Sequence, residues 1–333
     1  MENNNINAYP QMINGEQVYV LKREPAGPFA PVPQPAQQPS KGRKVGAVFI
    51  SIIPWVILQV VQTIVLLFVF VYEARDIISD SFSRGRIKDV DALMELLGDS
   101  IGPTMLIYGI ISAVGFGIFY MIKYVKFREI GRNLYNVGWR FWLGAFIASV
   151  GAQTFAQGFV NMIQRIPGID DLMEQMYSNN PMYDVFNTDN MTLSLAIALV
   201  LIVPIAEELV FRGIAGGILA KAGHSARFIL VFTALYFAIA HGNVLQIIYV
   251  AVLGFAEGYM YIKKKTIIPT ILMHIFYNFL GTFPLIGDTV SKMPYPAYPL
   301  LALAGLGMVA GAFFLARSEK KKDLNVNATQ TIS

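Results

Sequence analysis

Long apolar runs alternate with short polar loops along most of this 333-residue chain. A helix needs about 20 mostly apolar residues to cross the hydrocarbon core of a bilayer. Eight segments reach or approach this length: 45–72, 104–122, 141–163, 192–220, 226–242, 243–262, 266–284 and 297–316. The pattern therefore predicts an all-α, polytopic membrane helix bundle with about eight transmembrane helices.

The charge of the connecting loops alternates along the chain. Lysine and arginine dominate before the first segment and in every second loop after it, at 41–44, 123–140, 221–227, 263–265 and 317–322. The long loops 73–103 and 164–191 are mostly acidic. Because loops rich in Lys and Arg face the cytosol, we expect a multi-pass protein of the cell membrane with both termini in the cytoplasm.

Composition agrees with a membrane protein and excludes some other classes. Charged residues make up 14% of the chain, against about 25% in soluble domains. The chain has no cysteine, which excludes disulfides and thiolate catalysis. The basic residues are scattered between apolar spans, so the sequence predicts a lipid bilayer as partner and no nucleic acid.

Three of the apolar segments contain polar residues whose burial in lipid is costly. They are Glu207, Glu208 and Arg212 in 192–220, His241 in 226–242, and His274 with Asn278 in 266–284. Counted from the cytosolic loops at 1.5 Å per residue, these groups lie roughly 13–20 Å along their helices. We therefore predict that three helices bring polar side chains to one layer.

The spacing of these residues assigns them different tasks. Glu208 and Arg212 are four residues apart, so they share a helix face and can form an ion pair. Glu207 points about 100° away and has no local partner. Such a carboxylate can act as general base to a water, and histidine or asparagine side chains can donate to an oxyanion. The set can hydrolyse a peptide bond without a covalent nucleophile.

The same residues allow other interpretations. Glu207, His241 and His274 could bind a divalent metal such as Zn²⁺ and leave one position for water, so a reaction that requires no cofactor and a metal-dependent one both stay open. A polar layer can also be a set of interhelical hydrogen bonds or a transport pathway. The chain has no internal repeat, which argues against a transporter.

Glu257 is a further carboxylate within 243–262. Its nearness to Lys263 suggests a position close to the membrane interface. We expect a structural role for it, paired with a lysine or lining a path of substrate access.

Three motifs in these segments resemble those of the CPBP family. The stretches EELVFR at 207–212, FAIAH at 237–241 and HIFYN at 274–278 match its patterns E-E-x-x-x-R, F-x-x-x-H and H-x-x-x-N in order. This family, also named Abi, contains the intramembrane proteases of the CAAX-protease and bacteriocin-processing group. The resemblance covers about 192–280.

The resemblance implies a glutamate-dependent membrane endopeptidase that acts on a peptide or membrane-protein substrate. By motif position, the catalytic residues would be Glu207, His241, His274 and Asn278, with Glu208 and Arg212 as a supporting pair. The glutamate would activate water, the first histidine would assist it, and the second histidine and the asparagine would form the oxyanion hole. Eukaryotic members cleave prenylated CAAX tails, a specificity we do not transfer. Bacterial relatives are linked to peptide maturation or to bacteriocin self-immunity, and a non-catalytic immunity or scaffolding membrane protein on the same fold is the alternative.

These predictions divide the chain into four parts. Residues 1–44 are polar and then Pro-rich, lack the apolar stretch of a signal peptide, and are expected to be a disordered cytosolic tail. Residues 45–190 would hold N-terminal transmembrane helices and external loops. The CPBP/Abi catalytic core would occupy 191–284, and 285–333 would be the last transmembrane helix with a basic cytosolic tail.

Overall fold

The computed structural model describes residues 7–13, 16–22, 39–84, 96–125, 134–135, 137–169, 191–283 and 287–318. The chain separates into two compact units, Met1–Pro39 and Ser40–Ser333. All of the candidate chemistry belongs to the second unit.

The first unit contains a β-hairpin where we predicted a disordered tail. Strand β1 (Asn7–Ile13) pairs antiparallel with β2 (Glu16–Lys22), with Tyr9 opposite Val20. In the sequence the two strands are separated by Asn-Gly, the dipeptide most typical of two-residue hairpins, and β2 contains the strand-favouring run Val18, Tyr19 and Val20. We missed the hairpin because the prediction for residues 1–44 relied on their overall polar and Pro-rich composition.

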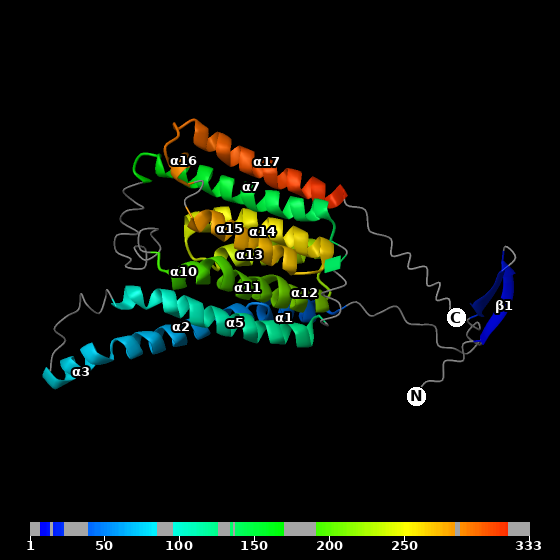
Figure 1. Ribbon diagram of the computed structural model, residues 1–333, viewed down its shortest axis with the longest axis horizontal. Helices are drawn as coiled ribbons and strands as arrows, with labels where there is room; N and C mark the ends of the chain where they lie inside the picture. The colour runs from blue at the N-terminus through cyan, green and yellow to red at the C-terminus, as the bar shows by residue number, and fades with distance from the viewer. Residues whose placement is uncertain are drawn as a thin grey trace. The chain divides into compact units, whose positions relative to one another are not determined.

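All eight apolar segments predicted from the sequence form helices in the second unit (Figure 1). The helices are α1 (Lys41–Ile50), α2 (Ile53–Glu73), α3 (Arg75–Arg84), α5 (Ile101–Lys123), α7 (Trp139–Gln164), α10 (Leu193–Ile197), η2 (Ala198–Ile202), α11 (Val203–Glu208), η3 (Leu209–Ala215), α12 (Gly216–Lys221), α13 (Ala226–Ile239), α14 (Val244–Lys264), α15 (Ile268–Thr282), α16 (Gly287–Ser291) and α17 (Ala297–Ser318). Among the described residues, six helical stretches are long and apolar enough to cross a membrane. The prediction of a polytopic helical membrane bundle is confirmed, with six such stretches in place of eight.

Two motif-bearing helices account for the difference in number. Helix α13 has 14 residues and α15 has 15, both short of the roughly 20 needed to span. Helix α13 ends early because the chain turns at Gly242, whose φ is 72°, and Asn243 caps α14 by accepting two backbone hydrogen bonds. This turn places His241 just beyond the end of α13.

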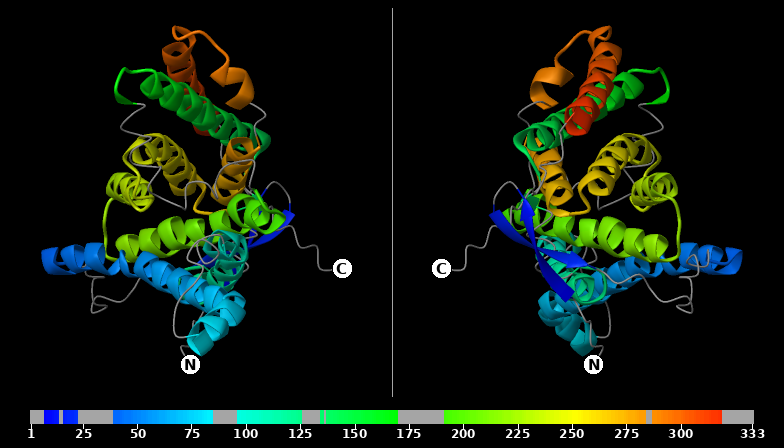
Figure 2. Two further views of the ribbon diagram at one scale, coloured as in Figure 1. Left: turned by 90° about the vertical axis from the view of Figure 1, so that its left-hand side faces the viewer. Right: turned by 90° about the vertical axis from the view of Figure 1, so that its right-hand side faces the viewer.

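The helices of the second unit pack in successive groups. Helix α7 packs along α17 and also contacts α14 and α15, whereas the stretch α10–α12 contacts α5, α13 and α15. Both views in Figure 2 place α13, α14 and α15 between the stretch α10–α12 and the α7–α17 pair. The three motif-bearing parts of the chain therefore meet in the middle of the bundle.

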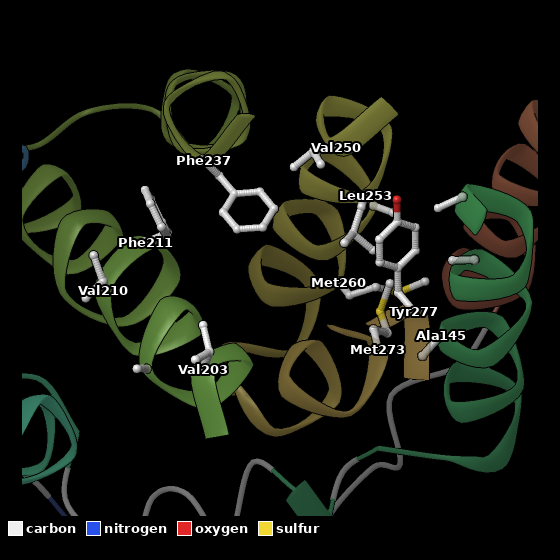
Figure 3. Packing of buried hydrophobic residues seen from close by; sticks show 14 of the residues in the cluster. Ala145, Val203, Val210, Phe211, Phe237, Val250, Leu253, Met260, Met273 and Tyr277 are labelled. Atoms are coloured by element: carbon white, nitrogen blue, oxygen red, sulfur yellow. The ribbon is translucent and has the colours of Figure 1, made fainter. Parts of the chain in front are cut away.

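Apolar side chains fill the space between these helices. Figure 3 shows Phe237 of α13 pointing between Phe211 of η3 and the α14 residues Val250 and Leu253. The rings of Phe211 and Phe237 meet edge to face, with centroids 5.1 Å apart. This packing fixes the second motif helix against the first.

Candidate active site

Glu207 and Glu208 lie near the middle of the continuous helical stretch Leu193–Lys221. Two parts of this stretch, η2 and η3, are π-helical and flank α11, which carries both glutamates. π-Helical turns are rare and occur frequently at functional sites. Because each π-helical turn changes the rotation of the residues around it, the two segments set the direction in which the glutamates point.

Four buried side chains form what we name the inner charge cluster: Glu208, Arg212, Glu257 and His274. Each exposes at most 2% of its surface. The Arg212 guanidinium forms an ion pair with Glu208 through Nη1 and with Glu257 through Nη2, the latter at 2.9 Å. Its Nη2 also donates to the Gly254 carbonyl at 3.2 Å. One cation thus joins α11, η3 and α14.

His274 lies between carboxylates on both sides of its ring. Its Nδ1 is 3.4 Å from Glu208 Oε1 and 3.8 Å from Glu257 Oε1, and its Nε2 is 3.5 Å from Glu207 Oε2. The Glu207 side chain is 19% exposed, whereas Glu208 and Glu257 are fully buried. Glu207 is therefore the carboxylate on the outer side of the imidazole.

Phe237, the first residue of the second motif, links the charged groups. The Arg212 guanidinium lies over its ring at 4.4 Å from the centroid. The rings of His241 and His274 lie nearly perpendicular to it, with centroid distances of 4.8 and 5.4 Å. A cation–π contact and two edge-to-face contacts hold Arg212 and both histidines around one apolar side chain.

His241 has a defined arrangement of its ring nitrogens. Its Nδ1 is 2.8 Å from the Phe237 carbonyl oxygen. Because a carbonyl only accepts hydrogen bonds, Nδ1 carries the hydrogen, and in a neutral ring Nε2 then presents its lone pair. The half-buried His241 is close enough to Glu207 for an electrostatic interaction.

Asn278 lies one helical turn beyond His274 on α15. Its Nδ2 donates to the Leu199 carbonyl in η2 at 2.8 Å. The bond ties α15 to the π-helical part of the glutamate-bearing stretch, and a primary amide has a second N–H for another acceptor. Across the described part of the chain, no hydrogen bond links Asn278 to the other candidate residues.

The position of Glu257 differs from our expectation, which placed it near the membrane interface beside a lysine. It is fully buried, paired with Arg212 of the first motif, and close to His274 of the third motif. The sequence did contain a signal for this contact. A buried arginine between helices, such as Arg212, can pair with more than one carboxylate, and Glu257 is a further carboxylate within an apolar segment. A Cβ at the nearby Gly254 would lie 3.1 Å from the Ala234 carbonyl oxygen, so α14 approaches α13 closely here.

The residues fit a metal ion poorly. Among the described residues, the only potential ligand group is Glu208, Glu257 and His274, whose donor atoms lie within 4.8 Å of one another. Both of these carboxylates already contact the permanently charged Arg212 guanidinium. The set Glu207, His241 and His274 named from the sequence does not form such a group, so no step of the chemistry is assigned to a metal here.

Comparison with known proteins addresses the same part of the chain. Residues 189–280 match the family model "Type II CAAX prenyl endopeptidase Rce1-like". No curated protein and no solved structure matches the chain. The matched residues hold all three motifs together with Glu257. The family identified from the motifs is thus confirmed: residues 189–280 form an Rce1-like domain, consistent with the CPBP/CAAX protease family, which implies intramembrane protease activity.

Proposed function

We propose that this chain is an intramembrane endopeptidase in which Glu207 activates a water molecule for attack on a peptide bond. One observation carries the proposal: Glu207 is the partly exposed carboxylate of the site, 3.5 Å from His274 Nε2, while Glu208 and Glu257 are bound to Arg212. A carboxylate that is not already neutralised by a guanidinium can take a proton from water.

The remaining residues are assigned by the groups that they present. The water oxygen attacks the peptide carbonyl carbon while Glu207 accepts the water proton. His241 presents the Nε2 lone pair on the side away from its Phe237 bond. There it can accept a hydrogen bond from the water, and then relay to the leaving amine the proton that Glu207 has taken from the water. His274 Nε2 and Asn278 Nδ2 would stabilise the oxyanion that forms on the peptide oxygen. Breakdown of this intermediate breaks the C–N bond and yields a carboxylic acid and an amine.

Glu208 and Arg212 would support these residues without touching the substrate. Glu208 contacts His274 Nδ1 at 3.4 Å, and Arg212 is packed on Phe237. Together they orient the imidazole and the second motif helix. Oxyanion donors are effective only when their positions are set before the reaction, which gives the supporting pair its purpose.

The cellular role is proposed on the family relation and on the charge of the loops. We propose a multi-pass protein of the cell membrane with cytoplasmic termini, acting in peptide maturation or in bacteriocin self-immunity. The matched family is described as a prenyl endopeptidase, so a prenylated peptide is a second substrate to test.

Cleavage of membrane-anchored peptides in proteoliposomes tests this function. We expect the wild type to cleave at least one peptide, Glu207→Gln to be inactive, and a strong chelator to have no effect on the wild type. Asp99→Asn, which alters an exposed carboxylate, should behave as wild type. Full activity of Glu207→Gln would refute the assignment, and no cleavage of any peptide would favour a non-catalytic immunity or scaffolding protein.

A further inference from the structure

We propose that the hydroxyl of Tyr108 binds the water molecule that Glu207 activates, which makes Tyr108 a further catalytic residue. The proposal rests on the proposed function. It adds to the site a residue of α5, a helix that lies outside the three motifs and outside the matched residues 189–280.

The packing of α5 places Tyr108 beside the glutamate-bearing stretch. Helix α5 contacts α10, η2 and α11. A Cβ at Gly109 would lie 3.0 Å from Ile202 Cγ2 and 3.4 Å from Val203 Cγ2, so the two helices approach closely at the residue next to Tyr108. Tyr108 is 4% exposed and belongs to the same buried cluster as Val203. It is therefore buried close to α11, the helix that carries Glu207.

The Tyr108 hydroxyl is close to Glu207 but is not bonded to it. The two side chains are near enough for an electrostatic interaction, and within the described part of the chain no hydrogen bond engages the Tyr108 hydroxyl. The hydroxyls of Tyr236, Tyr259 and Tyr298, by contrast, each donate to a backbone carbonyl. A buried tyrosine hydroxyl normally has such a partner. That of Tyr108 is thus free to donate to a small molecule that also contacts Glu207.

The bonding directions of water explain the use of a hydroxyl at this place. A water molecule has two hydrogens to donate and two lone pairs. In the proposed reaction its hydrogens point to Glu207 and to Nε2 of His241, and one lone pair attacks the peptide carbonyl carbon. The second lone pair can accept from Tyr108, which keeps its own proton throughout. This bond orients the water for attack and stabilises the negative charge that develops on its oxygen.

A purely structural role explains the Tyr108 hydroxyl less well. Burying a hydroxyl without a hydrogen bond costs free energy, and phenylalanine would fill the same space without that cost. Tyr120, further along α5 and also buried, shows the structural case, because its hydroxyl is bonded to that of Tyr261 on α14. The two tyrosines of α5 therefore form a matched pair for experiments.

Kinetics and thermal unfolding of the two variants give the first test. We expect Tyr108→Phe to lose about 10- to 100-fold in kcat, the value of a hydrogen bond to a group that becomes charged. Its KM should stay close to wild type and its unfolding midpoint should not fall. Tyr120→Phe should show the opposite pattern, a lower midpoint with wild-type kcat. If Glu207→Gln is inactive but Tyr108→Phe keeps the wild-type kcat, the proposal for Tyr108 is wrong while the proposed function stands.

Fluorine NMR gives a second test that needs no activity. A tyrosine that carries fluorine beside its hydroxyl is placed at position 108, where its signal reports on the hydroxyl. We expect Glu207→Gln to shift this signal, because the water bound between the two groups loses its carboxylate acceptor. The same probe at position 120 should not respond. An unchanged signal at position 108 would overturn the proposal. If Glu207→Gln cleaves peptides normally, the proposed function fails, and this signal still decides whether Tyr108 and Glu207 are linked.

Discussion

Two groups of helices in the second unit are held together by different means. Helices α7 and α17 approach backbone to backbone: a Cβ at Gly158 would lie 2.6 Å from the Ala302 nitrogen, and one at Gly151 would lie 2.8 Å from the Gly305 oxygen. The helices of the candidate active site are joined instead by ion pairs and aromatic contacts around Arg212 and Phe237.

This difference separates a closely packed helix pair from the candidate active site. Small residues let membrane helices pack closely without polar groups. Ionisable groups at the same depth are costly and are retained where they have a function. We therefore expect the α7–α17 pair to tolerate changes in the charged residues of the site, and the candidate site to depend on its charged network. The following variants test this contrast.

The largest effect is expected from Arg212→Met. It removes the cation that contacts Glu208 and Glu257, both fully buried, and leaves two carboxylates close together. Breaking a buried ion pair in this way costs about 3–5 kcal/mol of unfolding free energy. Unfolding in mixed micelles should measure the loss. The exposed Arg140 supplies the control, because Arg140→Met should leave stability nearly unchanged; equal stability of both variants would contradict the network.

Asn278→Ala should act mainly on the reaction. Loss of one oxyanion donor lowers kcat by about 10²–10³-fold, while the lost bond to the Leu199 carbonyl should cost only about 0.6 kcal/mol in a membrane bundle. Asn161 on α7 makes a similar side-chain bond, to the Gln157 carbonyl, and is the matched control. Asn161→Ala should keep wild-type kcat, and a comparable loss in both variants would argue against a catalytic role for Asn278.

Gly158→Val should act mainly on stability. The added side chain would meet the backbone of Ala302 on α17, and overpacking of this kind costs about 1–3 kcal/mol. Cleavage per folded molecule should be unchanged. Gly115 has open space around its Cβ position, so Gly115→Val should be far milder. A strong loss of kcat in folded Gly158→Val would show that the two helix groups are coupled.

Ser149→Ala is expected to give the smallest effect. The Ser149 hydroxyl of α7 is 3.0 Å from the Met273 carbonyl oxygen of α15, so it is a direct polar link between the two groups. Interhelical bonds of this kind average about 0.6 kcal/mol. Thr63→Ala, which removes an exposed bond to the carbonyl of Gln59 in the same helix, is the control. If Ser149→Ala lost several times more unfolding free energy than this, the hydrogen bond between Ser149 and Met273 would be a main stabilising contact between the two helix groups.

The helical segments and the family were predictable from the sequence. Apolar runs and helical spacing are local properties of the chain, and each of the eight runs became a helix. The three motifs were also visible locally, and a match over 189–280 confirmed the family. The break between α13 and α14 at Gly242 was predicted as well, because the apolar segments 226–242 and 243–262 meet there.

The partners of the charged residues were decided by the tertiary structure. Glu257 was expected near Lys263, but the rotation and depth of α14 turn it onto Arg212 and His274. The π-helical segments on both sides of α11 likewise change where Glu207 and Glu208 point. Hydrophobic pattern determines which segments become membrane helices, because burial of apolar area depends on the segment itself. Which charges meet depends on how those helices are rotated and packed against each other, and only the folded chain sets that.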